Sequence, residues 1–98
     1  MSPRLEFHES ADLELNEAAD FYDLRSPGLG GAFLDEVERG LGHIARHPGG
    51  AALALGAVRK RILARFPYSI LHSVSEDRIR ILAIAHQKRR PFYWRRRR

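Results

Sequence analysis

Residues 68–86 have the sequence YSILHSVSEDRIRILAIAH, in which two alternating segments flank the turn-like residues 75–77. Apolar and polar side chains alternate along residues 68–74, and nearly every second position of residues 78–86 is β-branched or apolar. A period of two is typical of a strand, whose side chains point to its two faces in turn. We therefore predict two consecutive antiparallel strands. The second should be central in its sheet, because both of its faces are apolar.

A third strand is expected just before this pair. Two sets of side chains alternate there: Val58, Lys60 and Ile62 on one side, and Arg59, Arg61 and Leu63 on the other. The alternation ends at Phe66-Pro67, which suits a turn. Three strands in succession form an antiparallel meander. The preceding residues 49–56 are rich in Gly and Ala without clear periodicity, so we expect a loop there.

The N-terminal half predicts a strand and two helices. Polar and apolar residues alternate over residues 3–8, which indicates a short strand. Ser10 is the expected N-cap of a helix that runs to about Leu24, because apolar residues recur there at steps of three and four. After a break at residues 26–31, a second helix repeats this spacing until residues 47–50.

Together these elements predict an α+β fold. It consists of a strand, a helical hairpin and a three-stranded antiparallel meander, followed by a short C-terminal basic tail. The helical pair should cover one face of the small sheet. A chain of 98 residues allows one hydrophobic core, so we expect a single domain over residues 1–98.

The composition argues against several classes of function. The chain has no cysteine, which excludes a disulfide framework, a thiolate metal site and a cysteine nucleophile. His43 and His47 are four residues apart without a third ligand, so neither a metal nor another cofactor is expected. No apolar run approaches the roughly 20 residues of a membrane span, and the first residues lack an apolar signal core. We therefore expect a cytoplasmic protein with no membrane partner.

Charge is unevenly divided along the chain. Residues 1–50 contain ten acidic and four basic residues, whereas residues 51–98 contain two acidic and thirteen basic residues. The C-terminal half must therefore build a basic surface, which predicts an anionic partner such as nucleic acid or an acidic protein segment. Residues 88–98 combine seven basic residues with the aromatic residues 92–94, a mixture suited to phosphate contacts and base stacking. The final four arginines carry less weight, because such termini are often disordered.

Four short motifs follow the order of the expected elements. They are Glu17 to Tyr22 (EAADFY), Pro27 to Val37 (PGLGxxFLxEV), Val58-Arg59 with Arg65 to Ile70 (RFPYxI), and Ile84 to Trp94 (IAHxxRRPxYW). Together they resemble the RelE/ParE family of bacterial toxins over nearly the whole chain. The resemblance implies a monomeric toxin domain, made with an antitoxin whose C-terminal segment lies across the toxin and masks it. One branch of the family resembles ribosome-dependent mRNA endonucleases, and another resembles inhibitors of DNA gyrase.

The residues favour the ParE-like, gyrase-inhibiting branch. In the nuclease branch an arginine that grips phosphate follows the tyrosine of the penultimate strand, and a tyrosine lies in the tail. This chain has Ser69 and Trp94 at those positions, and an indole cannot transfer a proton. We therefore expect a toxin that inhibits growth by binding DNA gyrase, or a gyrase–DNA complex, and blocking replication. The expected target-binding residues are Arg59, Arg61, Arg65, His86, Lys88, Arg89, Arg90, Tyr93 and Trp94.

The alternative is a metal-independent mRNA endoribonuclease of the RelE type that acts at the ribosome. Cutting RNA without a metal requires groups that activate the 2′-hydroxyl, protonate the leaving oxygen and stabilise negative charge. Arg61, His86, Lys88 and Tyr93 could fill these roles here, with His86 as the best acid–base candidate because imidazole titrates near neutral pH. A nontoxic nucleic-acid-binding module is a third interpretation, but the chain has no standard signature of one.

Structural interpretations compete with these functional ones. His86 could cap the end of the last strand through a hydrogen bond with the tail backbone. Tyr68 and Trp94 could pack on the core, as large aromatic residues usually do. The cations at positions 59, 61 and 65 could simply form the solvated face of a strand.

Overall fold

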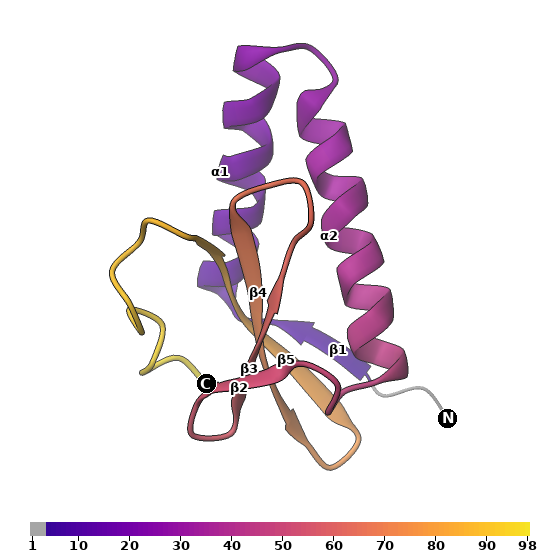
Figure 1. Cartoon of the computed structure of the whole chain (residues 1–98), viewed down its shortest axis with the longest axis vertical. Coiled ribbons are helices and arrows are strands. Elements are labelled where there is room, and N and C mark those ends of the chain that lie inside the picture. The colour runs from indigo at the N-terminus through magenta and orange to yellow at the C-terminus, as the bar shows by residue number, and fades with distance from the viewer. Residues whose placement is uncertain (1–3) are drawn as a thin grey trace.

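The computed structural model describes residues 4–98, so the expected start of the first strand at residue 3 lies outside the described residues. The elements are β1 (Arg4–Phe7), α1 (Glu9–Arg25), α2 (Leu29–Arg46), β2 (Ala52–Leu55), β3 (Val58–Ile62), β4 (Tyr68–Ser75) and β5 (Arg78–His86) (Figure 1). The predicted order of strand, helical hairpin and antiparallel meander is therefore confirmed. Neither of the two helices in this range is long and apolar enough to cross a membrane.

The five strands form one mixed sheet in the order β1-β5-β4-β3-β2. Neighbouring strands are antiparallel except β1, which pairs in parallel with β5. β5 lies between β1 and β4, as its two apolar faces predict, although β4 holds the middle position. The first strand, β1, and the last strand, β5, thus lie side by side in the sheet.

The helical hairpin covers one face of the sheet, which we call the inner face. The main core lies there, where Ile70 of β4 and Ile79, Ile81 and Ile84 of β5 pack against buried residues of both helices. A second, smaller cluster lies on the opposite or outer face, where Leu71 and Leu82 pack against Trp94 from the end of the chain. Both faces of β5 are therefore buried, each by a different part of the chain.

A β-bulge in β5 decides which side chains reach the outer face. Leu71 pairs with Ala83, but the next residue, His72, pairs with Ile81, so Leu82 is an extra residue in the ladder. As a result the adjacent residues Leu82 and Ala83 both belong to the outer cluster. The bulge enlarges the apolar patch that receives the chain end.

The expected loop at residues 49–56 is wrong, because residues 52–55 form the edge strand β2. Ala52 pairs with Lys60 of β3, and Gly56, with φ 56°, lies in the tight turn between the two strands. Leu53 and Leu55 remain exposed and only Ala54 is partly buried, against the outer cluster, so this short strand carries no clear burial pattern in its sequence. Pairing with β3 and the glycine turn specify it instead.

The expected N-cap of α1 at Ser10 is also wrong. His8 is the N-cap, and its Nδ1 accepts a hydrogen bond of 3.0 Å from the backbone N–H of Ser10. At the start of α2, Gly28 has φ 89° and provides no side-chain cap. A carboxylate oxygen of Asp23 instead accepts the N–H of Gly30 at 2.8 Å, so α1 caps α2 across the hairpin.

His72 should make stability depend on pH below about 6.5, its ordinary pKa. The side chain is fully buried, with Nε2 2.9 Å from the Pro48 carbonyl oxygen and no partner for Nδ1 among residues 4–98. Burial lowers the pKa of His72, and Arg59 and Arg61 lower it further against the opposing effect of the Pro48 hydrogen bond. Below pH 6.5, His72 therefore binds a proton in the unfolded chain more readily than in the folded chain. As a result, the free energy of unfolding falls as pH drops.

We expect the wild type to lose up to about 1.4 kcal/mol per pH unit through this residue as pH falls from 6.5. His72→Gln keeps a donor for Pro48 but cannot titrate, so its pH profile should be flatter. Urea unfolding at pH 7.5 and 5.5 measures both slopes. The other histidines are the same in the two proteins, so identical slopes would contradict this assignment.

Candidate functional site

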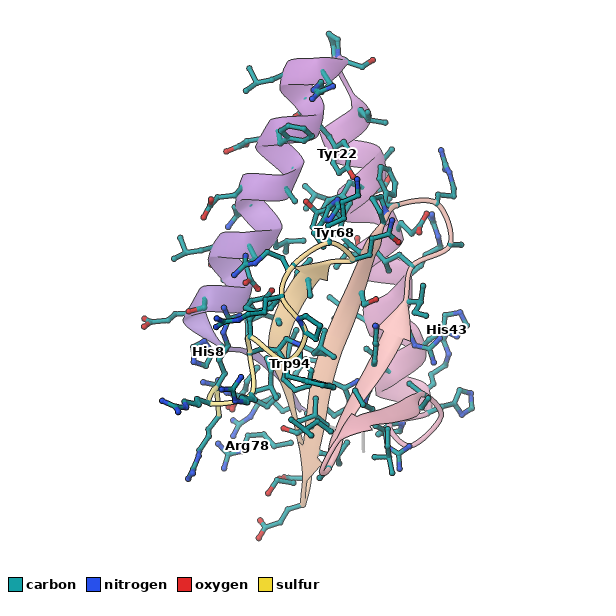
Figure 2. All side chains as sticks on the ribbon, turned by 60° about the vertical axis from the view of Figure 1, so that its left-hand side comes forward. His8, Tyr22, His43, Tyr68, Arg78 and Trp94 are labelled. Atoms are coloured by element: carbon teal, nitrogen blue, oxygen red, sulfur yellow. The ribbon has the colours of Figure 1, made fainter. Side chains whose placement is uncertain are left out.

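Residues 87–98, which we call the tail, turn back across the outer face of the sheet (Figure 1). Trp94 anchors this path, because its side chain is only 4% exposed and packs on the outer cluster (Figure 2). The packing interpretation of Trp94 is therefore confirmed. Tyr68 also packs on the core, on the inner face, where its ring meets those of Tyr22 and Phe33.

A carboxylate of α1 holds the tail in place. The Tyr93 hydroxyl donates to Glu14 Oε2 at 2.8 Å, and the two terminal nitrogens of Arg97 donate to the two carboxylate oxygens at 2.9 and 3.0 Å. The backbone N–H of Ile84 donates to Oε1 at 3.0 Å, which ties β5 to the same group. We call these four residues the Glu14 cluster. Its ion pair is mostly buried, with 15% of the Glu14 side chain and 17% of the Arg97 side chain exposed.

Arg97 is therefore held in place, although residues near a chain end are often disordered. Arg97 also donates to the carbonyl oxygen of Leu82 at 3.0 Å, so it contacts both a helix and a strand. The sequence gives no signal for this pair, because Glu14 is one of several acidic residues in its helix and lies 83 residues from Arg97. Only the fold brings the two side chains together.

The Glu14 cluster also determines the chemistry of Tyr93. Burial raises the pKa of the Tyr93 hydroxyl, and the hydrogen bond to Glu14 raises it far above the usual range. The hydroxyl is thus a fixed donor to a carboxylate. This arrangement does not suit the acid–base role that the nuclease interpretation assigns to Tyr93.

His86 ends β5 in the way the capping interpretation predicts. It pairs with Tyr68 across the sheet, and the two rings meet edge to face with centroids 4.9 Å apart. The Nδ1 of His86 accepts the backbone N–H of Lys88 at 3.0 Å, and its carbonyl oxygen accepts the N–H of Arg89 at 3.0 Å. His86 therefore shapes the turn into the tail.

The structure divides the expected target-binding surface into two parts. Arg59 and Arg61 alternate with Lys60 along β3, so they lie on the inner face with α2, whereas the tail crosses the outer face. Both are half-buried, and Arg59 donates to the Ala51 carbonyl oxygen at 2.6 Å. The interpretation of these two arginines as a solvated face is therefore wrong. Arg65 is exposed in the loop after β3, and its backbone N–H donates to the buried carboxylate of Glu36.

Three exposed cations remain together at the start of the tail, namely Lys88, Arg89 and Arg90. Within residues 4–98, no carboxylate lies within ion-pair distance of any of them. The guanidinium of Arg89 lies 3.8 Å from the centre of the Tyr93 ring, and Tyr93 is fixed by Glu14. Residues 88–90 therefore expose three positive charges without an acidic partner in residues 4–98, and the following residues Tyr93 and Trp94 fix this part of the tail to the protein.

A cavity of about 190 Å³ lies between the tail and the outer face, and we call it the tail cavity. Its lining residues are Ala54, Lys60, Ser69, Leu71, Ala85, His86, Gln87, Arg89, Arg90, Pro91, Phe92, Tyr93 and Trp94. Ser69, the residue in place of the phosphate-gripping arginine of the nuclease branch, thus faces this cavity. Lys60 was outside the expected target-binding set, because the sequence does not show on which face the tail lies. No three metal-ligand side chains within residues 4–98 are placed to hold a metal ion.

Comparison with known proteins supports these observations. Residues 5–91 match the sequence model of a family described as the ParE toxin of type II toxin–antitoxin systems, parDE. No curated protein sequence matches the chain. A solved structure described as the chromosomal ParDE toxin–antitoxin system from P. aeruginosa contains a chain that matches with a TM-score of 0.77 and 21% identity. The match covers 87% of this chain and 96% of that chain, and at this identity it shows a common fold.

The family match begins within β1, covers all the other strands and both helices, and extends into the tail. It therefore includes β1 and β5, which lie far apart in the sequence and pair in parallel in the sheet. The chain therefore belongs to the ParE toxin family and is the toxin component of a type II toxin–antitoxin system.

Proposed function

We propose that this toxin arrests growth by binding DNA gyrase, or gyrase engaged with DNA, through the cations at the start of its tail. The observation that carries the proposal is the group Lys88, Arg89 and Arg90, three exposed cations without an acidic partner in residues 4–98. Clustered charge of one sign attracts and orients a partner of the opposite sign. Anchoring by Trp94 and the Glu14 cluster reduces the entropy that the segment would lose on binding.

The same geometry argues against the endoribonuclease alternative. Ser69 supplies no cation at the phosphate-gripping position, the Tyr93 hydroxyl is committed to Glu14, and Nδ1 of His86 is committed to the tail backbone. Arg61, another of the proposed catalytic residues, lies with α2 on the inner face and does not line the tail cavity, whereas His86 and Tyr93 do. These three side chains are therefore not gathered around one site, as metal-independent cleavage of a phosphate requires.

A type II toxin is paired with a cognate antitoxin, and we propose that the antitoxin covers the tail cations. An acidic segment would match their charge, and the exposed edge strand β2 offers backbone groups to an extended segment. Masking the tail would explain how the pair stays harmless while both proteins are present.

The gyrase proposal is tested by gyrase-dependent cleavage of supercoiled plasmid with ATP and the purified, antitoxin-free toxin. We expect linear DNA to accumulate only when toxin and gyrase are both present. The triple variant Lys88→Ala, Arg89→Ala, Arg90→Ala should reduce the linear product at least tenfold, because each change removes a charge from the proposed contact.

A matched triple variant controls for lost charge. Arg95→Ala, Arg96→Ala, Arg98→Ala removes three exposed cations from the same tail and leaves residues 88–90 and Arg97 in place. It should retain most of the activity. Full activity in a folded residue 88–90 variant would contradict the proposal, and so would induced cells whose protein synthesis stops before DNA synthesis, which is the order expected of a ribosomal nuclease.

A further inference from the structure

Polar side chains from the sheet and from the tail line the tail cavity. Lys60 of β3 and Arg90 of the tail both line it, and no carboxylate within residues 4–98 is in ion-pair distance of either. The buried Ser69 and the exposed Gln87 line the same cavity and add a hydroxyl and an amide to it. Two cations, a hydroxyl and an amide around one space form a donor-rich site for an anion.

The opposite wall of the cavity is aromatic. Trp94 forms its buried part, and Phe92 stands 5.9 Å from Trp94 between ring centroids, with its own side chain 42% exposed. Phe92 has φ 59°, a left-handed conformation that is rare and strained for a bulky residue. The two anchored residues that follow it, Tyr93 and Trp94, maintain this conformation and hold the ring at the cavity instead of in the core.

The volume of the tail cavity suits one unpaired base. About 190 Å³ leaves room for one base but not for a base pair with its two backbones. A flat apolar wall beside paired cations suits an unpaired nucleotide, because its base can stack on an aromatic ring while its phosphate meets the cations. A duplex would keep its bases stacked on one another and offer only phosphates.

We propose that the tail cavity binds one unpaired nucleotide of a single-stranded nucleic acid. The base stacks on Phe92, the phosphate lies between Lys60 and Arg90, and Ser69 and Gln87 provide further hydrogen bonds. This inference deepens the proposed function, since it gives a toxin that acts on gyrase and DNA a direct contact with the nucleic acid. It is tested on the toxin alone, so its outcome is independent of gyrase.

The test uses fluorescence anisotropy with labelled eight-nucleotide oligomers of deoxythymidine and of uridine, and with a duplex of equal length. We expect the toxin to bind the single strands more tightly than the duplex. The deoxyribose and ribose arms show whether the site accepts both sugars. Equal affinity for single strands and duplex would overturn the proposal in favour of general charge attraction, and so would a folded toxin that fails to bind either oligomer.

Phe92→Gly separates stacking from stability. Glycine adopts positive φ without strain, so this variant should remain folded while it loses the stacking surface. We expect its affinity for deoxythymidine oligomers to fall about tenfold, within the range known for loss of one stacked base. Phe92→Tyr restores the ring and should recover the affinity; unchanged affinity in Phe92→Gly would contradict the proposal.

Lys60→Gln tests the phosphate contact against Arg96→Gln, which removes the same charge at an exposed tail position outside the cavity lining. Lys60→Gln should weaken binding and lower the salt slope by about 0.7, the value for one phosphate contact on a single strand. Arg96→Gln should change the affinity less than twofold. A toxin that binds oligomers but does not act on gyrase contradicts only the proposed function, whereas a gyrase-active toxin that binds no oligomer contradicts only this inference.

Discussion

Glu14→Ala is expected to lower the free energy of unfolding by about 3 kcal/mol, because it leaves a mostly buried arginine without its partner. The change also removes the acceptor of the Tyr93 hydroxyl and of the Ile84 N–H. Unsatisfied buried donors add to the loss. Since the carboxylate joins α1, β5 and the tail, the tail should detach from the sheet before the rest of the domain unfolds.

Urea unfolding measures the stability, and amide hydrogen exchange of residues 92–97 measures release of the tail. Glu17→Ala, an exposed position in the same helix, is the matched control and should change the stability by less than about 0.5 kcal/mol. Glu14→Gln keeps one acceptor oxygen, so it provides a variant that folds while the ion pair is lost. Unaltered exchange of the tail in both Glu14 variants would refute the anchoring role.

Gly30→Ala is expected to destabilise the protein by about 3 kcal/mol, at the upper end of the range for overpacking. A Cβ at Gly30 would collide with the carbonyl oxygen of Ala19 and lie 2.7 Å from Cγ of Asp23. Both groups belong to α1, so the hairpin would have to open. Separation of the helices would also break the Asp23 hydrogen bond that caps α2.

The neighbouring residue provides the control for this substitution. A Cβ at Gly31 would meet nothing within 4 Å, and Gly31 is exposed in α2. Gly31→Ala should therefore stabilise the protein by up to about 1 kcal/mol through helix propensity. Thermal or urea unfolding of the two variants should move in opposite directions; a similar stability for both would contradict the close approach of the helices at Gly30.

The sequence predicted those elements whose burial is periodic. β4 and β5 bury alternate side chains against different clusters, and the hairpin has an apolar stripe, so the α+β class followed from pattern alone. β2 was not predicted, because only Ala54 among its residues is partly buried and the strand depends on pairing with β3. The N-cap at His8 was not predicted, because a ring nitrogen takes the place of the usual hydroxyl or carboxylate acceptor.

The site was less predictable than the fold. Alternation along β3 correctly places Arg59 and Arg61 on one face and Lys60 on the other, but it does not show which face the tail covers. The identity of Ser69 indicated an altered nuclease site, whereas the role of Glu14 depends on contacts across 70 to 83 residues of sequence. Spacing rules describe neighbours in a helix or strand and carry no information at that range.

The long separation within the Glu14 cluster has a consequence during synthesis of the chain. Glu14 is synthesised 83 residues before Arg97, so their contact can form only after the strands of the sheet and residues 87–97 have left the ribosome. The tail therefore takes its final position late in synthesis. We expect that an antitoxin already present in the cell can meet the emerging chain before this basic surface is complete.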